Sequence, residues 1–338
     1  MWSEEKLDAM LTDPSDRLVG DMARIEGDIL ILGAGGKMGP SLAILAKRAA
    51  EAAGTPKRII AVSRFTDPVA AQLLRNHGVE TLAADLLDRA ALEQLPQTEN
   101  VIFMAGKKFG THGQETDTWA MNTRVPALVA DHYRHSRIVV FSTGNIYPRV
   151  PLNAGGCTED TLPSPVGEYG MSALGRERMF EYAAQRYGTP IVLFRLNYAV
   201  DLRYGVLNDM ASNILAGTPI SLSNPCFNCV WQKDANEIAL RCLPYANSHV
   251  FKLNVTGPET AAVAPVAHRL ARLLGCSVSF AGTPGGDAYL NDAARMVGLF
   301  GYPQVPLDTL VEWQAQWLLQ GGRSLGKPTH FEESEGKY

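Results

Sequence analysis

Short apolar runs alternate with amphipathic, helix-prone stretches from residue 28 to about residue 200. Strands are predicted over the apolar runs at 29–32, 58–62, 79–83, 100–104, 137–141 and 191–194. Helices are predicted between them, over 40–53, 68–77, 89–95, 115–135 and 169–187. This alternation indicates an α/β fold, a doubly wound parallel sheet with helices on both faces. Ligands of such sheets bind at the carboxyl ends of the strands, so the residues after each strand are the candidates for chemistry.

The same pattern divides the chain into four parts. Residues 1–27 are polar and helix-prone and are expected to form an N-terminal extension on the surface or at a partner contact. Residues 28–200 form the sheet domain, and 201–322 are expected to form a smaller, mainly helical substrate domain. Residues 251–256 are expected to return to the sheet. The tail 323–338 carries Gly, Pro and Glu and is expected to be flexible.

Composition excludes several classes of function. The chain has 338 residues and a formal net charge of −4, so it lacks the basic footprint of a nucleic-acid-binding protein. No apolar run reaches the roughly 18 residues that a membrane span needs. The five cysteines are an odd number, which favours a reduced, cytoplasmic protein. The pair Cys226 and Cys229 has no second ligand pair in the sequence, so no metal is expected.

A glycine-rich turn follows the first predicted strand. It reads Gly33-Ala34-Gly35-Gly36-Lys37-Met38-Gly39, with a GxxGxxG spacing between strand and helix. Gly33 allows a tight turn, Gly35 or Gly36 lets the backbone approach a pyrophosphate at the helix N-terminus, and Gly39 lets the helix pack on the strand. The turn predicts a Rossmann-type site for NAD or NADP that Lys37 and Met38 also line.

The next two strand ends carry residues suited to the adenosine half of such a cofactor. Ser63-Arg64 follows the second strand, where a site for NAD usually has an acidic residue. Arg64 could pair with the 2′-phosphate of NADP, stack on adenine, or stay in solvent, so the choice between NAD and NADP is open. Asp85-Leu86 follows the third strand and places a carboxylate near the expected adenine amino group.

The fourth predicted strand ends in Met104-Ala105-Gly106, and the small residues Ala105 and Gly106 leave room for a cofactor. Lys107 and Lys108 come directly after them. Two lysines at this place are either solvated loop residues or cations near the cofactor and the substrate.

Two further segments carry hydroxyl groups. Ser142-Thr143 ends the fifth strand and is followed by Gly144-Asn145-Ile146-Tyr147. The long predicted helix begins with Tyr169-Gly170-Met171-Ser172. In this order and spacing the segments resemble the extended short-chain dehydrogenases/reductases of the NAD-dependent epimerase/dehydratase family, from about residue 28 to residue 320. Weaker matches of the same kind are Trp119–Asn122, Arg195–Tyr198, Val230–Ala235 and Asn254–Gly257.

The resemblance implies roles for the matching residues, and the cations Lys107, Lys108 and Arg203 are added as candidates because of their own positions in the chain. A homodimer is also expected. Catalytic roles fall on Tyr169, Thr143, Ser142, Asn122 and Lys108, with Tyr169 as the general acid/base. Cofactor contacts fall on the turn, on the strand ends named above, and on Tyr169 and Leu196. Substrate contacts fall on Lys107, Asn145, Asn197 and Arg203. Arg203 is expected either to hold a substrate carboxylate or to form a surface salt bridge.

One departure from the family pattern concerns catalysis. The family's lysine four residues after the tyrosine binds the nicotinamide ribose and lowers the tyrosine pKa, and here that residue is Ala173. An unperturbed tyrosine titrates near 10. Either Lys107 or Lys108 supplies an ammonium from another strand, or the chain binds a dinucleotide without turnover.

Two other departures concern the substrate. Nucleotide-sugar 4,6-dehydratases carry an acid pair where this chain has Gly144-Asn145. Nucleotide-sugar enzymes usually have an arginine in the segment that here reads Asn224–Cys229, and none is present. The sequence therefore predicts an NAD(P)-dependent epimerase or oxidoreductase acting on a sugar, sugar acid or nucleotide sugar. The alternative is a non-catalytic dinucleotide sensor or scaffold of the same fold.

Overall fold

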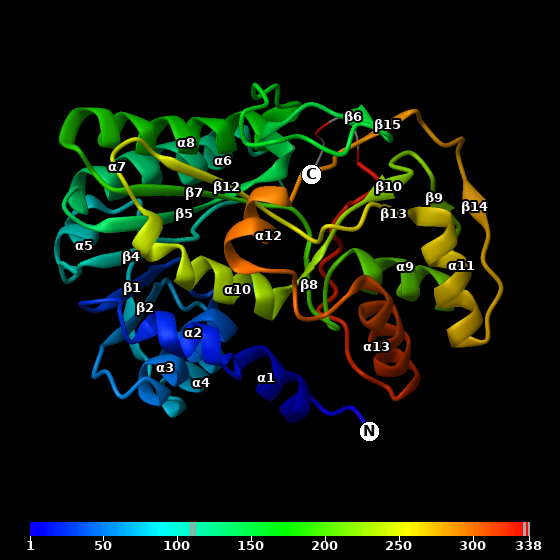
Figure 1. The fold of residues 1–338 in the computed structure, drawn as a ribbon, viewed down its shortest axis with the longest axis horizontal. Helices are drawn as coiled ribbons and strands as arrows, with labels where there is room; N and C mark the ends of the chain where they lie inside the picture. Colours follow the sequence, from blue (N-terminus) through cyan, green and yellow to red (C-terminus); the bar gives the residue numbers. More distant parts are fainter. Residues whose placement is uncertain (109, 111–112, 334–335, 337–338) are drawn as a thin grey trace.

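A seven-stranded parallel sheet forms the centre of the computed structural model, which describes residues 1–108, 110, 113–333 and 336. The strand order is β12-β7-β5-β4-β1-β2-β3 (Figure 1). Their bounds are β1 Ile29–Leu32, β2 Ile59–Ser63, β3 Glu80–Ala83, β4 Asn100–Phe103, β5 Arg137–Thr143, β7 Ile191–Leu196 and β12 Phe251–Val255. The predicted doubly wound sheet is confirmed, and β12 returns to it beside β7.

Helices cover both faces of this sheet (Figure 1). One face carries α5 Arg89–Glu93, α6 Glu115–Trp119, α7 Val125–His132 and α8 Gly167–Tyr187. The other carries α2 Asp16–Met22, α3 Gly39–Ala52, α4 Pro68–Asn76, α10 Gln232–Arg241 and α12 Ala294–Phe300. Because successive strand residues point to opposite faces, Ile29 and Ile31 join one core while Leu30 and Leu32 join the other. Burial on both faces explains the unbroken apolar runs.

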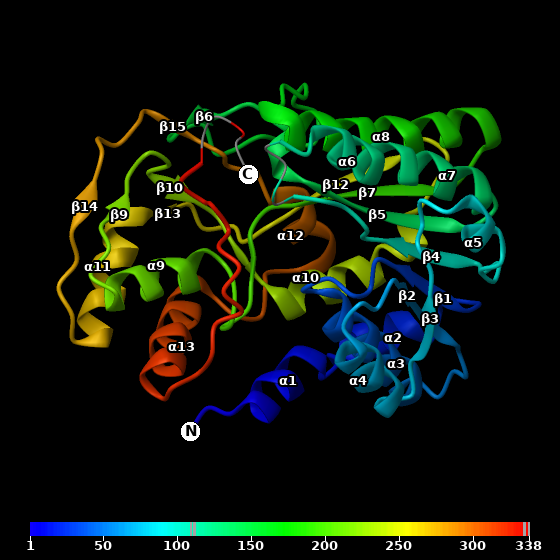
Figure 2. The ribbon, with the colours of Figure 1, turned by 180° about the vertical axis from the view of Figure 1, so that it is seen from behind.

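A second lobe lies beyond the carboxyl ends of the strands (Figure 2). Its helices are α9 Val206–Leu215, α11 Val263–Leu274 and α13 Leu307–Leu319. Its short strands are β6 Val150–Pro151, β8 Ala199–Val200, β9 Ile220–Ser221, β10 Cys226–Phe227, β11 Val230–Trp231, β13 Ala261–Ala262, β14 Phe280–Ala281 and β15 Asp287–Ala288. Trp231 and Trp317 are the largest side chains of its core.

The N-terminal extension is part of both cores. Leu7 and Leu11, on α1 Glu4–Thr12, are buried in the core of the second lobe. Leu18 and Met22, on α2, are buried under the sheet. The extension therefore joins the two lobes, a role that its polar composition did not suggest.

The sequence predicted a flexible tail over 323–338, and the described residues of this segment, 323–333 and 336, make contacts with the second lobe. Thr329 and Phe331 are buried. The Asn224 side-chain amide donates to the Phe331 carbonyl at 2.8 Å, and the Leu325 N–H donates to the Arg203 carbonyl at 2.8 Å. One apolar anchor and these backbone partners hold the described part of the segment along the second lobe (Figure 2).

The helix predicted over 115–135 is interrupted by a π-helical turn, Ala120–Arg124, between α6 and α7. Pro126 follows at the start of α7. A proline inside a helix cannot donate to the carbonyl four residues earlier and its ring collides with that group, so the helix widens before it. Such turns often occur at functional sites, and this one contains the fully buried Asn122.

A buried ion pair holds α8 against the sheet. Arg195 on β7 makes a two-pronged contact with Glu177 on α8, with Nε–Oε1 at 3.0 Å and Nη2–Oε2 at 2.8 Å. Neither side chain is exposed by more than 1%. Ser142 at the end of β5 donates to Glu177 Oε1 at 2.6 Å. Buried charges are tolerated only when they are paired and hydrogen-bonded in this way.

We predict that Glu177→Gln lowers the free energy of unfolding by about 3–5 kcal/mol, because it leaves the Arg195 charge buried without a counter-ion. Urea unfolding measures the change. The matched control is Glu93→Gln, which breaks the exposed helical pair with Arg89 and should change stability only slightly. Equal effects of the two substitutions would contradict the prediction.

Candidate active site

A cavity of about 140 Å³ lies at the carboxyl ends of β5 and β7, beside the glycine turn and the start of α8. Many of the predicted site residues line it. They are Met38, Lys108, Ser142, Thr143, Asn145, Tyr169, Leu196 and Asn197. The structure thus brings together groups from the glycine turn, three strand ends and one helix.

Tyr169 stands in the first turn of α8 and is 8% exposed. Its hydroxyl hydrogen-bonds with the side chain of Thr143. Thr143 Oγ1 also donates to Asn145 Oδ1 at 3.1 Å. Burial raises the pKa of Tyr169, while the Arg176 charge and the Thr143 hydrogen bond oppose that rise. The arrangement presents one phenol beside one threonine hydroxyl, as acid/base chemistry on a substrate oxygen requires.

The two lysines after β4 diverge. Lys108 lines the cavity, with Nζ 5.7 Å from the centre of the Tyr169 ring and 5.9 Å from that of Tyr198. Burial lowers the pKa of Lys108 to about 8. The Lys107 ammonium instead contacts Gln114 and lies 4.0 Å from Asp117. The structure therefore favours Lys108 over Lys107 as the cation beside the tyrosine.

Asn122 organises the site from behind the cavity. Its amide nitrogen donates to the Lys107 carbonyl at 2.8 Å and to Ser172 Oγ at 3.0 Å. Its oxygen accepts from the Lys107 N–H at 2.8 Å. These bonds tie the loop after β4 to α8, so Asn122 positions the backbone that carries Lys108.

Arg176 is a site residue that the sequence analysis missed. It is 6% exposed, and its guanidinium donates to the Phe141 carbonyl at 2.7 Å and to Asn122 Oδ1 at 2.8 Å. The sequence did contain a signal for Arg176: it follows Tyr169 by seven residues, a spacing that places both on the same face of a helix. Ala173, one turn before Arg176 on the same helix, is fully buried.

Four other residues line the cavity: Tyr198, Ala199, Tyr204 and Thr329. Tyr198 lies in a segment that matched the family pattern but was given no role, whereas Tyr204, from the chain entering the second lobe, and Thr329, from the C-terminal segment, gave no local signal. Tyr198 has φ 44°, an unusual conformation for a residue other than glycine that often marks a functional site. Thr329 donates from its N–H and its hydroxyl to Asp209 Oδ2, at 2.7 and 2.5 Å.

Arg203 does not join the cavity lining. Its guanidinium pairs with Asp201, Glu4 and Asp8, each at 2.9 Å. Of the two expectations for Arg203, the salt bridge is the one that the structure shows. Its contacts hold the N-terminal helix on the second lobe.

The glycine turn fits a dinucleotide pyrophosphate. Gly33 has φ +91°, and a Cβ at Gly39 would overlap the Ala34 carbonyl, so the fold itself needs these two glycines. Gly36 is different: a Cβ there would meet nothing closer than the Gly33 carbonyl at 3.6 Å, an ordinary contact. The N-cap residue of α3, Met38, makes no side-chain capping bond. The first N–H groups of α3 therefore have no side-chain cap, which suits an anion-binding site.

Lys37 adds positive charge to this turn. Its Nζ lies 3.3 Å from the centre of the Tyr204 ring. Burial, then Lys108 and Lys327, lower the pKa of Lys37 to about 7, while Asp209 acts in the opposite direction. Lys37 and Lys108 therefore bring two ammonium groups close to each other, one at the turn and one in the cavity.

The residues expected around adenosine flank the turn. Ser63 ends β2, and the next residue, Arg64, is exposed. Asp85 is also exposed, and its carboxylate accepts from the Leu87 N–H at 3.0 Å. Leu86 is buried in the core beside them. Their contacts with a cofactor stay predictions.

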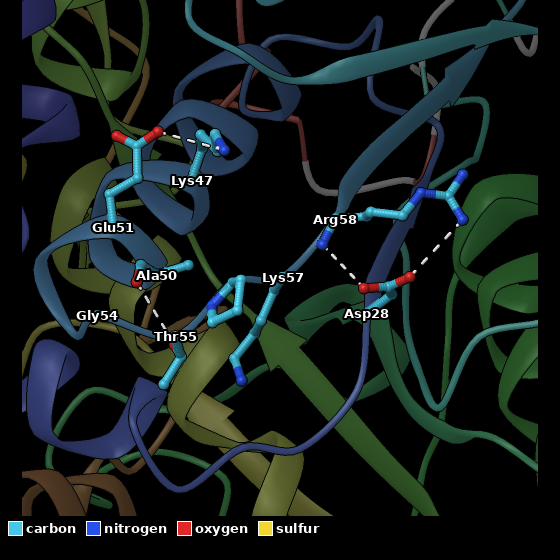
Figure 3. A pocket seen from close by; sticks show the side chains of 9 residues that line it. Asp28, Lys47, Ala50, Glu51, Gly54, Thr55, Lys57 and Arg58 are labelled. Atoms are coloured by element: carbon cyan, nitrogen blue, oxygen red, sulfur yellow. Dashed lines mark hydrogen bonds and ion pairs between the residues drawn. The ribbon is translucent and has the colours of Figure 1, made fainter.

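A larger hollow, of about 620 Å³, lies at the opposite end of the sheet (Figure 3). Asp28 and Arg58 in its lining precede β1 and β2, and their charges face each other, as do those of Lys47 and Glu51. Ligands of parallel sheets bind at the carboxyl ends of the strands, so we assign the site to the smaller cavity.

Within the described ranges, no cluster of three His, Cys, Asp or Glu residues could hold a metal ion. The same residues contain no helix suited to crossing a membrane.

The sequence matches the NAD dependent epimerase/dehydratase family over residues 29–224, and the chain belongs to that family. Family membership agrees with the resemblance predicted from the motifs. No curated protein matches the sequence.

Solved structures share the fold at low sequence identity. UDP-glucuronic acid 4-epimerase from Bacillus cereus, in complex with UDP-glucuronic acid and NAD, is 19% identical with a TM-score of 0.69. UDP-glucose 4-epimerase from Thermotoga maritima, with UDP-glucose, is 16% identical with a TM-score of 0.71. Each match covers 87% of this chain and 99% of the other. dTDP-glucose 4,6-dehydratase from Bacillus anthracis, in complex with NAD, is 17% identical over 87% and 96%, with a TM-score of 0.72.

We predict that Gly36→Ala leaves thermal stability nearly unchanged but weakens binding of NAD(H) or NADP(H) at least tenfold, because the new methyl group occupies the space before the helix N-terminus. Calorimetric titration and a thermal melt measure the two effects. Gly286→Ala is the matched control, since Gly286 also has open space around its Cβ position and no positive φ. Unchanged dinucleotide affinity in Gly36→Ala would contradict the assignment of the turn.

Proposed function

We propose that this protein is an NAD(P)-dependent epimerase or oxidoreductase acting on a sugar or sugar acid. One observation carries the proposal: Tyr169, Thr143 and Lys108 converge on a single cavity beside the open glycine turn. The family match supports a dinucleotide-dependent enzyme of this kind. Three of the structures with this fold contain NAD or a nucleotide sugar, which supports the same class of chemistry.

Tyr169 acts as the general acid/base in this proposal. Its hydroxyl exchanges a proton with a substrate hydroxyl or carbonyl oxygen, and Thr143 hydrogen-bonds the same oxygen. The bound nicotinamide accepts or donates a hydride at the adjacent carbon. In an epimerase the hydride returns to the other face of the substrate, and in a dehydrogenase the cofactor exchanges.

Lys108 supplies positive charge on the cavity side of Tyr169. A phenol gives up its proton more readily when a cation stabilises the phenolate. The ammonium lies 5.7 Å from the ring centre, close enough to act on the charge that develops there. Lys108 thus takes over part of the work of the lysine that Ala173 replaces.

The charge of the cavity favours an anionic substrate. Among the described residues no arginine lines the cavity. Arg203 is held by three carboxylates, and the Asn224 amide binds the C-terminal segment. Lys37 and Lys108 would complement a carboxylate, so we propose a sugar acid as the substrate before a nucleotide sugar.

The second candidate function is a dinucleotide sensor or scaffold without turnover. Ala173 favours it, because the residue that lowers the tyrosine pKa in the family is missing. The two candidates differ in whether Tyr169 takes part in a reaction, and one substitution separates them.

We predict that Tyr169→Phe abolishes turnover and leaves dinucleotide affinity within a factor of about three, because the substitution removes the proton donor and keeps the ring. The measurement is the oxidation or reduction of nicotinamide with a panel of sugar acids, paired with calorimetric binding. Tyr182→Phe, an exposed tyrosine on the same helix, is the matched control. Full turnover in Tyr169→Phe would remove the proposed role.

We also predict that kcat/KM falls as the pH rises through about 7 and falls again near pH 8, because Lys37, with a pKa of about 7, and Lys108, with a pKa of about 8, lose their positive charges in turn. In Lys108→Met kcat/KM should be lower at every pH and the fall near pH 8 should be absent. Lys107→Met, which removes an ammonium directed toward Gln114, should keep the wild-type profile. A fall near pH 8 that persists in Lys108→Met would show that another group titrates there.

A further inference from the structure

α8 carries a buried arginine on the same face as the missing lysine. Ala173 and Arg176 follow Tyr169 by four and seven residues, spacings that share one side of a helix. Helical side chains lean back toward the N-terminus, so the long side chain of Arg176 runs toward the turn that contains Ala173. The small side chain of Ala173 leaves room for the Arg176 side chain, whereas a lysine at position 173 would place a second cation in the same space.

The Arg176 head group lies among the strand ends at the base of the site. Its guanidinium donates to the Phe141 carbonyl at the end of β5 and to Asn122 Oδ1 in the π-helical turn. A Cβ at Gly106, just after β4, would overlap the Nη2 atom. The glycine expected to make room for a cofactor therefore also makes room for this guanidinium.

The acceptors that hold Arg176 are both neutral. Among the described residues Arg176 forms no salt bridge, and its Nε lacks a hydrogen-bond partner. The neighbouring carboxylate of Glu177 is already bonded to Arg195 through both oxygens. The positive charge of Arg176 is therefore not cancelled by a close ion pair, and its field reaches the groups around it.

We propose that Arg176 is a positioning residue that supplies, from one helical turn further along α8, the buried positive charge beneath Tyr169 that position 173 lacks. The inference rests on the proposed acid/base role of Tyr169. When the proton moves from the Tyr169 oxygen to a substrate oxygen, the negative charge stays on the phenolate. Arg176 stabilises that charged state and has no comparable effect on the neutral phenol.

The electrostatics of the site agree with this assignment. Burial raises the pKa of Tyr169, and Arg176 is the largest influence that lowers it. A guanidinium keeps its charge across the working range of pH, and its planar group can hold two acceptors at once. Lys108, with a pKa of about 8, changes its charge within that range. Arg176 therefore supplies, from α8, a positive charge that does not change with pH. Lys108 supplies, from the cavity, a positive charge that is lost as the pH rises through about 8.

The test measures the ionisation of Tyr169 directly, by ultraviolet difference titration of the full-length protein over the pH range in which circular dichroism shows an intact fold. Each variant is paired with the same variant carrying Tyr169→Phe, so that the difference reports Tyr169 alone. Arg176→Met should lower the acid dissociation constant of Tyr169 at least tenfold, and Arg176→Lys should lower it less. Adding Ala173→Lys to Arg176→Met should raise that constant again toward its wild-type value. The pH profile of kcat should shift in the same order.

An unchanged Tyr169 titration in Arg176→Met overturns the inference. If that variant does not fold, Arg176→Lys decides the question: a weakened ionisation constant supports the inference, and a wild-type value makes Arg176 a purely structural residue. The titration results can be distinguished from the turnover results that test the proposed function. Turnover that survives Tyr169→Phe removes the function while the titration still reports the charge near the tyrosine, and a lost turnover with an unchanged titration removes only the inference.

Discussion

The buried pair of Glu177 and Arg195 is the interaction on which the site depends. It joins α8 to β7, and Ser142 extends the contact to β5. Because both charges are withdrawn from water, their geometry is strict, and the rotation of α8 about its axis is set by it. The pair therefore holds the helix that carries Tyr169, which lines the cavity, and Arg176, which contacts Asn122 and the Phe141 carbonyl. Glu177 follows Tyr169 by eight residues, about two helical turns.

The charge around Tyr169 is distributed over more than one element. Lys108 comes from the loop after β4 and Arg176 from α8 itself, while Lys37 of the glycine turn lies near Lys108. A single lysine on the helix is thus one way to stabilise a phenolate, and cations from several elements are another. Lys108 in the cavity and Lys37 beside it together favour an anionic ligand, and the proposal of a sugar acid rests on them.

Much of the fold followed from local pattern. The strands of the central sheet are unbroken apolar runs because both faces are covered, and the glycine turn lies between a strand and a helix that are each recognisable alone. Tyr169 and Thr143 were predictable because family spacing marks them. Tyr204 and Thr329 were not, since they reach the cavity from segments whose course depends on the packing of the second lobe. The contacts of the C-terminal segment were not predictable either, because its composition is polar and one residue, Phe331, anchors it.

The most direct test of the account is a crystal structure of the chain with NADH or NADPH and a sugar acid. We expect the pyrophosphate on the turn at residues 33–39 and the nicotinamide facing the cavity, with the sugar oxygen between Tyr169 and Thr143. A dinucleotide bound instead in the hollow at the amino ends of the strands, or a nicotinamide directed away from Tyr169, would contradict it.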